Sequence, residues 1–383
     1  MIRLLLMIII NTSSCTSRIN HDKRIRGLIS GWAPLVWLAP GERFLPLSVP
    51  EFLEHVQAGD NYLQTRVDVK TLLSNETSFL YGKEPGTVPI YALVQNCLDS
   101  SAKSNLVTSD RRRIKRKRAV AYSRVGREDS VVQSNEILTK AEGSNHGEVS
   151  KLISKGKRSR KLNFHVTYWM FYPFSEGKAV CVLDLGFFGT WPIPSVEGVC
   201  LGQLKEYGNH VGDWEHMSLY FAGDDHPVAM YVSAHDAGAY YRYDIRSGTF
   251  IYESQETRKG IFQKPIFPER VFTSSGSHPI LFSAKGSHGL WTAPGKHKFV
   301  RIPRLYDESG FGTPWQTWKN LEVIPTENPS TAPSWMSFTG NWGNPRSNCH
   351  PLVNLGFNIC EFVDGPTGIP TKKGSFQCPS SCD

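Results

Sequence analysis

The sequence lacks the short motifs that mark many catalytic and nucleotide-binding sites. It contains no G-x-S-x-G nucleophile elbow, no Walker phosphate loop, no H-E-x-x-H metal motif and no G-x-G-x-x-G dinucleotide loop. Each motif sets a nucleophile, a metal ligand or a phosphate-binding backbone at a fixed spacing. Their absence weighs against an enzyme, although it leaves enzymes with other kinds of site open.

Long apolar runs and C-x-x-C pairs are also missing. No apolar run reaches the roughly 20 residues that a membrane-spanning helix needs. The eight cysteines favour disulfides over metal or redox sites if the compartment is oxidising. Short intervening segments favour the pairs Cys181–Cys200, Cys349–Cys360 and Cys378–Cys382, although sequence leaves the pairing open. Cys97 would then have no partner.

The first residues have the order of a secretory leader. Arg3 is followed by an apolar run from Leu4 to Ile10 and then by small polar residues, as in a signal peptide over residues 1–17. The alternative is a buried first strand. A signal peptide predicts a secreted protein or one of the endomembrane or vacuolar lumen, and it makes Asn75, in an N-E-T sequon, a glycosylation site.

The positive charge of the chain is concentrated in one segment. Residues 99–160 hold 16 Lys and Arg against 7 Asp and Glu, more than the whole net charge of +8. This polar segment, centred on RRRIKRKR, is typical of a disordered insert. This run has several possible functions: binding of anionic lipid or nucleic acid, a nuclear address, or cleavage after Arg116 in R-I-K-R. The alternative is a solvated loop without a dedicated partner. Cleavage fits a signal peptide best, and we expect no nucleic-acid partner.

The chain after the insert predicts a mainly β fold. Short runs rich in β-branched and aromatic residues alternate with Gly, Pro, Asn and Asp turns. These runs cover residues 164–174, 216–221, 227–234, 279–284 and 298–303. We therefore expect an antiparallel β-sandwich with a few short helices, its body at 161–368 and a cysteine-containing tail at 369–383.

Ligand-type side chains are concentrated in one predicted strand, YGNHVGDWEHMSLYF at 207–221. Side chains alternate between faces at about 3.3 Å per residue, so Asp213 and Glu215 share a face, while His216 points the other way. His210 precedes the turn that Gly212 permits and can fold back over the carboxylates.

Two carboxylates this close disfavour each other's charge unless a cation compensates. Oxygen-rich ligation with one imidazole favours Ca²⁺, Mg²⁺ or Mn²⁺ over zinc. The plain alternative is a solvent-facing acid pair beside a loop histidine. An acid/base couple for glycoside hydrolysis has a similar carboxyl separation, of about 5 to 9.5 Å, but no second carboxylate-rich segment supports it.

Two further histidines end strands at similar glycine turns. His235 lies in SAHDAG and His288 in SAKGSHG. With Asp236, they are candidates for the rim of the same site. The alternative, which is the commoner case for such a residue, is a satisfied structural histidine.

Eight blocks of the sequence carry a family resemblance. They occur in order from about residue 27 to 368, interrupted by the insert: GWAPLVWLAPGERFLP, YWMFYPF, GNHVGDWEH, YVSAHDAG, LFSAKGSHG, WQTWKNLEVI, GNWGNP and CEFVDGPTG. Together they resemble the vacuolar protein sorting-associated protein 62 family. The resemblance implies a role in delivering proteins to the vacuole, with no established biochemical activity, and makes residues 27–98 the amino-terminal segment of the family domain.

One block has a second, local likeness. N-H-V-G-D-W-E is similar to the G-H-R-H-D-W-E heptapeptide of the necrosis- and ethylene-inducing peptide-like proteins, which are secreted β-sandwich cytolysins that bind a divalent metal and sphingolipid headgroups. This resemblance implies that His210, Asp213 and Glu215 are metal ligands. The second histidine of the heptapeptide falls on Gly212.

The further Asp ligand of those cytolysins has no secure counterpart here, and Asp184 and Glu206 are only guesses. Such departures weigh against toxin activity more than against metal binding. We therefore expect a non-catalytic protein of the vacuolar sorting kind that binds a divalent cation and a membrane lipid or glycan headgroup. A metal-dependent cytolysin and a metal-assisted hydrolase are the alternatives, and the protein partners are unknown.

Overall fold

The structure is a computed structural model, and it describes part of the chain. The described residues are 22–97, 162–186, 189–193, 199–258, 265–300, 305–326, 332–350, 360–372, 376 and 378. The chain divides into two units, and residues 1–101 and 161–383 form the first, which contains every described residue. The predicted signal peptide, the basic insert and Arg116 lie outside the described residues.

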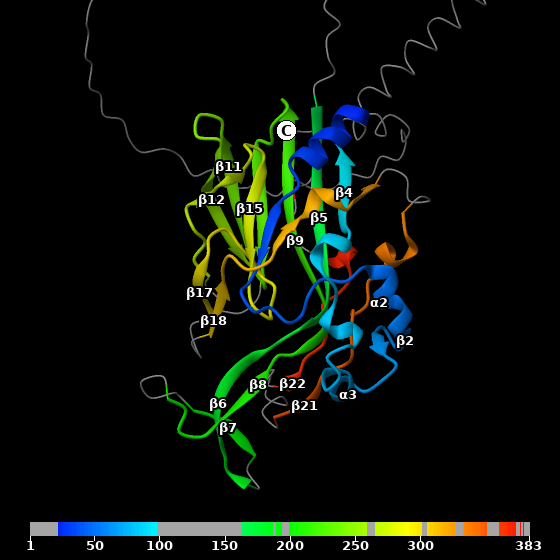
Figure 1. The fold of residues 1–383 in the computed structure, drawn as a ribbon, viewed down its shortest axis with the longest axis vertical. Helices are drawn as coiled ribbons and strands as arrows, with labels where there is room; N and C mark the ends of the chain where they lie inside the picture. Colours follow the sequence, from blue (N-terminus) through cyan, green and yellow to red (C-terminus); the bar gives the residue numbers. More distant parts are fainter. Residues whose placement is uncertain are drawn as a thin grey trace, which may run out of the picture. The chain divides into compact units, whose positions relative to one another are not determined.

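Eight strands form the larger of two main sheets, in the order β13-β12-β11-β10-β9-β5-β4-β20. Their bounds are β4 Ile90–Asn96, β5 Leu162–Ser175, β9 His210–Gly223, β10 Ala229–Ala234, β11 Ala237–Asp244, β12 Thr249–Thr257, β13 Arg270–Val271 and β20 Leu321–Pro325. Neighbours pair antiparallel except for β20, which runs parallel to β4. β5 and β9 form the longest pair and run through the middle of the fold (Figure 1).

The second main sheet faces the first and is built from distant segments. Its strands are β1 Leu35–Leu38, β14 Thr273–Ser274, β15 His278–Ser283, β16 Leu290–Trp291 and β19 Pro314–Gln316. β1 runs parallel to β15 and antiparallel to β19. The expected mainly β fold is therefore confirmed, with parallel pairs at β1–β15 and β4–β20 as exceptions to the antiparallel pattern.

Smaller elements surround the two sheets. Four small sheets pair β2 Val56–Ala58 with β3 Leu63–Thr65, β17 Gly295–Val300 with β18 Leu305–Ser309, β21 Ser347–Cys349 with β22 Cys360–Phe362, and β6 Lys178–Asp184 with both β7 Thr190–Pro192 and β8 Gln203–Tyr207. The helices are short: residues 22–31, α2 Val49–His55, α3 Val69–Leu73, and the 3₁₀ turns η1 Phe79–Tyr81, η2 Pro85–Thr87, η5 Thr317–Lys319, η7 Ser334–Ser337 and η9 Ile369–Thr371.

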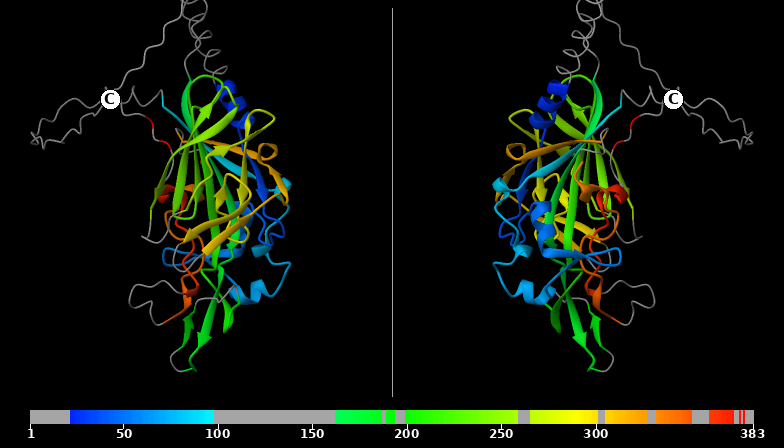
Figure 2. Two further views of the ribbon diagram at one scale, coloured as in Figure 1. Left: turned by 90° about the vertical axis from the view of Figure 1, so that its left-hand side faces the viewer. Right: turned by 90° about the vertical axis from the view of Figure 1, so that its right-hand side faces the viewer.

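The larger sheet is buried on both faces, which explains the nearly continuous apolar sequence of β5. Alternate β5 residues such as Tyr168 and Met170 belong to the core between the two main sheets. Trp169 and Phe171 belong to a second core on the other face, with residues of α2 and of the C-terminal region such as Trp342. Figure 2 shows the C-terminal segments, in orange and red, alongside the green strands. A strand with apolar cover on both faces loses the polar alternation of a half-exposed strand.

Three disulfides tie the described residues together. Cys181–Cys200 and Cys349–Cys360 are confirmed. The predicted Cys378–Cys382 pair is wrong, because Cys378 pairs with Cys97, 281 positions earlier. Phe376, two positions before Cys378, packs near Tyr220 of β9 and Tyr240 of β11. Loop length alone could not reveal this pairing, since sheet topology brings the two cysteines together.

Candidate functional site

The two acids of the ligand-type run lie on β9 and face the core between the main sheets. Asp213 pairs across the strands with Tyr172, and Glu215 pairs with Met170. Tyr172 and Met170 both belong to that core, and cross-strand partners share a face. Asp213 is 7% exposed and Glu215 is 5% exposed. The acids therefore lie on one side of the strand and are covered by protein.

His216 lies on the opposite face of β9. Its ring stacks on Trp169 at a centroid distance of 4.3 Å and lies near Tyr231 at 5.7 Å. The alternation of the strand thus separates His216 from Asp213 and Glu215. Its place is among the aromatic residues of the other face.

The start of β9 bends at Gly212, which has a φ of 70°. A Cβ atom at this position would overlap the carbonyl oxygen of Trp342. Left-handed φ and close backbone approach both demand glycine. The histidine that the cytolysin heptapeptide has at this point therefore has no room in this fold.

His288 holds Asp213 in place. Its Nδ1 lies 3.1 Å from Asp213 Oδ2, and its Nε2 lies 3.0 Å from the carbonyl oxygen of Phe44. The buried ring stacks on Tyr172 with 3.8 Å between centroids. Both ring nitrogens face acceptors, so the ring donates from both as an imidazolium. Burial opposes this charge, but the bond to Asp213 and the nearby charge of Glu42 raise the pKa of His288.

This pairing sets the charge of Asp213. Burial alone would raise its pKa, but the hydrogen bond from His288 and the positive charges of His288 and Lys372 hold the pKa of Asp213 below its ordinary value. Asp213 is therefore an ionised carboxylate that already has one cationic partner.

Glu215 has a different environment. Burial raises the pKa of Glu215 well above its ordinary value, and the charge of Asp213 raises it further. No hydrogen bond or ion pair from the described residues reaches its carboxylate. The positive charges that act on it are Lys372, which follows η9, and Arg258, which follows β12. Glu215 is thus a buried acid without a close partner in the part of the chain that the structure describes.

His210 is oriented for one further interaction. Its Nδ1 lies 2.8 Å from the carbonyl oxygen of Gly212. Burial lowers the pKa of His210 although the charge of Asp213 opposes this, so the ring is neutral at pH 7. A neutral ring that donates from Nδ1 has a lone pair on Nε2, which is the form that ligates a metal.

The three predicted ligands are near one another without forming a closed cage. Among the described residues, Cys97, His165 and Cys378 have ligand atoms that all lie within 4.8 Å of one another, and the three predicted ligands do not form such a group. A cation bound by His210, Asp213 and Glu215 would therefore have to draw these side chains together. Their role as ligands stays a prediction.

The comparisons with known proteins bear on the family. No protein-family model matches the chain, and no solved structure matches it. TDA6 of Saccharomyces cerevisiae, provisionally named as a vacuolar protein sorting-associated protein, is 27% identical over 221 residues, 54% of this chain and 41% of the relative. Vacuolar protein sorting-associated protein 62 of the same yeast is 25% identical over 224 residues, 52% of this chain and 39% of the relative.

The resemblance to the vacuolar protein sorting-associated protein 62 family is confirmed. The chain spans about two fifths of the length of the curated relatives it matches. The local likeness to the cytolysin heptapeptide rests on the motif residues alone.

Among the residues of the predicted rim, His235 joins a second buried acid. Its Nε2 lies 2.5 Å from Asp307 Oδ2. Asp307, fully buried, also accepts from Lys178 at 2.9 Å, from Ser287 at 2.8 Å and from Trp291 at 3.0 Å. Burial opposes ionisation, but His235 and Lys178 hold the pKa of Asp307 far below its ordinary value.

Asp236 lies beside the same turn and faces the charge cluster. Burial lowers the pKa of Lys372, and this effect prevails. The charge of Asp236 is one of those that oppose it. The guanidinium of Arg258 donates to the carbonyl oxygen of Ala237 at 2.7 Å and so holds the turn. His288 therefore contacts Asp213 directly, His235 contacts Asp307 instead, and Asp236 acts on the site through charge.

Sequence reasoning missed several members of these clusters. Lys178, Asp307 and Lys372 carry no local signal, because each is a common residue in an ordinary strand or turn. The repeated Ser-Ala turn was the only available signal, and it identified the two histidines.

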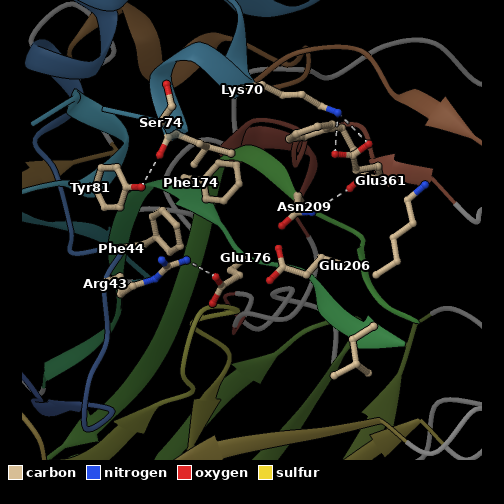
Figure 3. Close-up of a pocket in the computed structure, with 14 residues that line it drawn as sticks. Arg43, Phe44, Lys70, Ser74, Tyr81, Phe174, Glu176, Glu206, Asn209 and Glu361 are labelled. Atoms are coloured by element: carbon tan, nitrogen blue, oxygen red, sulfur yellow. Dashed lines mark hydrogen bonds and ion pairs between the residues drawn. The ribbon is translucent and has the colours of Figure 1, made fainter. Parts of the chain in front are cut away.

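Two pockets lie beside the first residues of β9. The first, of about 540 Å³, is shown in Figure 3. Arg43 pairs with Glu176 at 2.6 Å across it, and Lys70 pairs with Glu361 at 2.9 Å. Glu206, one of the guesses for a further ligand, lines this pocket, where burial and the charge of Glu176 raise its pKa.

The second pocket, of about 590 Å³, reaches the predicted cation site itself. His210 lines it together with polar and basic residues, namely Lys70, Asn344, Arg346 and Asn348. A ligand in this pocket would therefore lie beside His210. Asp184, the other guess, is exposed at the end of β6, where its Oδ1 accepts from Gly186 at 2.9 Å.

The remaining predictions concern location. Asn75 is exposed on a turn after α3, where its Oδ1 accepts from Thr77 Oγ1 at 2.7 Å, and its glycosylation stays a prediction. Among the described residues, no helix is both long and apolar enough to cross a membrane. The three disulfides fit an oxidising compartment.

Proposed function

We propose that this chain is a non-catalytic protein of vacuolar protein sorting that binds one Ca²⁺, Mg²⁺ or Mn²⁺ ion and, beside it, an anionic or glycosylated headgroup. The cation would be held by carboxylate oxygens of Glu215 and Asp213 and by Nε2 of His210. The names of the two yeast relatives support the sorting role.

The environment of Glu215 is the single observation that carries the metal site. Buried polar groups nearly always have a hydrogen-bond partner, and an exception calls for an explanation. Glu215 is 5% exposed, lies beside a second acid, and receives no hydrogen bond from the described residues. A hard divalent cation between the two acids would compensate both.

The pocket of about 590 Å³ supports the headgroup. Its lining includes the cations Lys70 and Arg346, the amides of Asn344 and Asn348, and one acid, Asp68. Guanidinium and amide donors suit phosphate, sulfate or sugar hydroxyl groups. Because His210 borders both places, a headgroup here would lie next to the cation.

Calorimetric titration with each of the three cations tests the metal site. We expect one binding event for the wild type. Glu215→Gln should weaken it by more than about tenfold, because one anionic ligand is lost. This variant keeps the shape of a protonated glutamate, so the fold should be unaffected. Glu206→Gln, which alters an acid of the neighbouring pocket, is the matched control and should bind as the wild type does.

The outcomes separate this proposal from its alternatives. Equal affinity in the wild type and in Glu215→Gln would refute the site. Cation-dependent flotation with vesicles that contain anionic or glycosylated lipid, without leakage, supports headgroup binding. Dye release from sphingolipid vesicles would indicate a cytolysin instead. Turnover of a phosphoester or glycoside that is lost in Asp213→Asn would indicate a hydrolase.

A further inference from the structure

A histidine lies on the far face of the large sheet from the acids, close to the Cys97–Cys378 disulfide. His165 of β5 pairs with Gln95 of β4, and the Cys97 amide at the end of β4 donates to the carbonyl oxygen of Asn163 at 2.8 Å. Residues two apart on a strand share a face, so Cys97 and His165 lie on the same side of the sheet. The tail brings Cys378 to this place.

The imidazole of His165 is buried without a hydrogen-bond partner in the part of the chain that the structure describes. It is 5% exposed, and neither Nδ1 nor Nε2 makes a hydrogen bond with the described residues. Burial lowers the pKa of His165 to about 4, so the ring is neutral at pH 7 and one nitrogen carries a free lone pair. A buried imidazole without partners is costly, and the structure offers it one neighbour of suitable chemistry.

That neighbour is the pair of sulfur atoms. One ligand atom from each of Cys97, His165 and Cys378 lies within 4.8 Å of the other two. Two thiolates and an imidazole form a soft donor set of the kind that binds Zn²⁺, and they differ from the oxygen-rich set on β9. Ligand atoms bonded to one tetrahedral Zn²⁺ at roughly 2.0 to 2.3 Å lie roughly 3.3 to 3.8 Å from one another, so the imidazole and the two sulfurs could reach such positions with small side-chain movements once the S–S bond is broken.

We propose that Cys97, Cys378 and His165 form a redox-dependent zinc site that replaces the disulfide when the disulfide is reduced. A dithiol reductant supplies two electrons and two protons, the S–S bond breaks to give two thiols, and the reductant becomes a disulfide. Zn²⁺ then binds the two sulfurs as thiolates, which releases the two protons, and Nε2 or Nδ1 of His165 is the third ligand. Water fills the fourth position.

The exchange keeps the tail attached in both redox states. The oxidised chain joins residues 97 and 378 through sulfur, and the reduced chain would join them through the metal. A link between positions so distant restricts the unfolded chain strongly in either form. The inference does not rest on the proposed headgroup site, since the two lie on opposite faces of the sheet and use different donor chemistry.

Alkylation of the wild-type chain, mapped by mass spectrometry, tests the site. The full chain is reduced with a phosphine, which is then removed, and treated with a thiol reagent with and without one equivalent of Zn²⁺. We expect zinc to slow the modification of Cys97 and Cys378 by more than about tenfold, because a bound thiolate is shielded from the reagent. Cys181 and Cys200, the matched control pair, should react at unchanged rates.

The histidine is tested separately. His165→Ala should bind zinc more than about tenfold more weakly than the reduced wild type, because one of three protein ligands is lost. Cobalt bound by reduced wild-type chain should show sulfur-to-metal charge-transfer absorption, a readout that does not depend on the folding of the variant. Equal protection of both cysteine pairs, no protection, or unchanged affinity in a folded His165→Ala would overturn the proposal.

Discussion

At the scale of single residues, two histidines at similar turns each pair with a buried aspartate. His235 and His288 end two Ser-Ala turns, and both adopt left-handed backbone, with φ of 54° and 57°. Each binds an aspartate from another strand, Asp307 in one case and Asp213 in the other. Strained backbone persists only where the surroundings enforce it. The two pairs therefore fix these turns to the sheets and position the charges near Glu215.

The Asp307 pair predicts a measurable loss of stability. Asp307→Asn should lower the free energy of unfolding by about 3 to 5 kcal/mol, because it leaves buried donors without their anion. Urea unfolding at neutral pH measures this. Glu308→Gln changes the adjacent residue, whose pair with Lys296 is largely exposed, and should cost less than about 1 kcal/mol. Equal effects of both changes would contradict the assignment.

The pH dependence follows from the same pair. The pKa of Asp307 is lowered in the folded state, so its contribution is fully present above the ordinary aspartate pKa and is lost as the pH falls through the lower folded value. As the pH is lowered from 7 towards 3, the free energy of unfolding should thus fall less in Asp307→Asn than in the wild type. Urea unfolding at each pH measures this.

At the scale of elements, the sequence pattern of a strand predicted the faces of its own side chains but not their partners on other strands. The alternation of β9 correctly placed Asp213 and Glu215 on one face and His216 on the other, because strand period is a property of adjacent residues. The partners could not be predicted this way. His288 lies 75 positions from Asp213, and Asp307 lies 72 positions from His235. Their meeting depends on which strands pair, and the parallel pairing of β1 with β15 has no signature in either strand.

The start of β9 gives a prediction for this element. Gly212→Ala should destabilise the fold by several kcal/mol and weaken cation binding, because the new Cβ would overlap the Trp342 carbonyl oxygen and displace His210 and Asp213. Gly223 ends the same strand with a φ of 106° and nothing within 4 Å of a new Cβ. Gly223→Ala is thus the control, with backbone strain alone of about 1 to 2 kcal/mol. Thermal unfolding of both variants should rank Gly212→Ala as clearly less stable.

At the scale of the whole molecule, the chain before residue 98 and the chain after residue 161 build one core. β1 lies in the smaller sheet and β4 in the larger, while the later strands complete both. Asn96 pairs with Phe164, and the Cys97 amide bonds to Asn163. The two described ends therefore meet as neighbours in an antiparallel pair, as the two strands of a hairpin do at their turn.

This meeting predicts that the fold does not need residues 98–161. Replacement of that segment by a short glycine-containing turn should give a chain with the same circular dichroism and a higher stability. Closure costs about 0.6 kcal/mol less for each halving of loop length, so roughly four halvings should add about 2 kcal/mol to the free energy of unfolding in urea. A Gly/Ser linker of the original length is the control and should leave stability near that of the wild type. A chain that fails to fold with the short turn but folds with the long linker would show that β4 and β5 do not meet in this way.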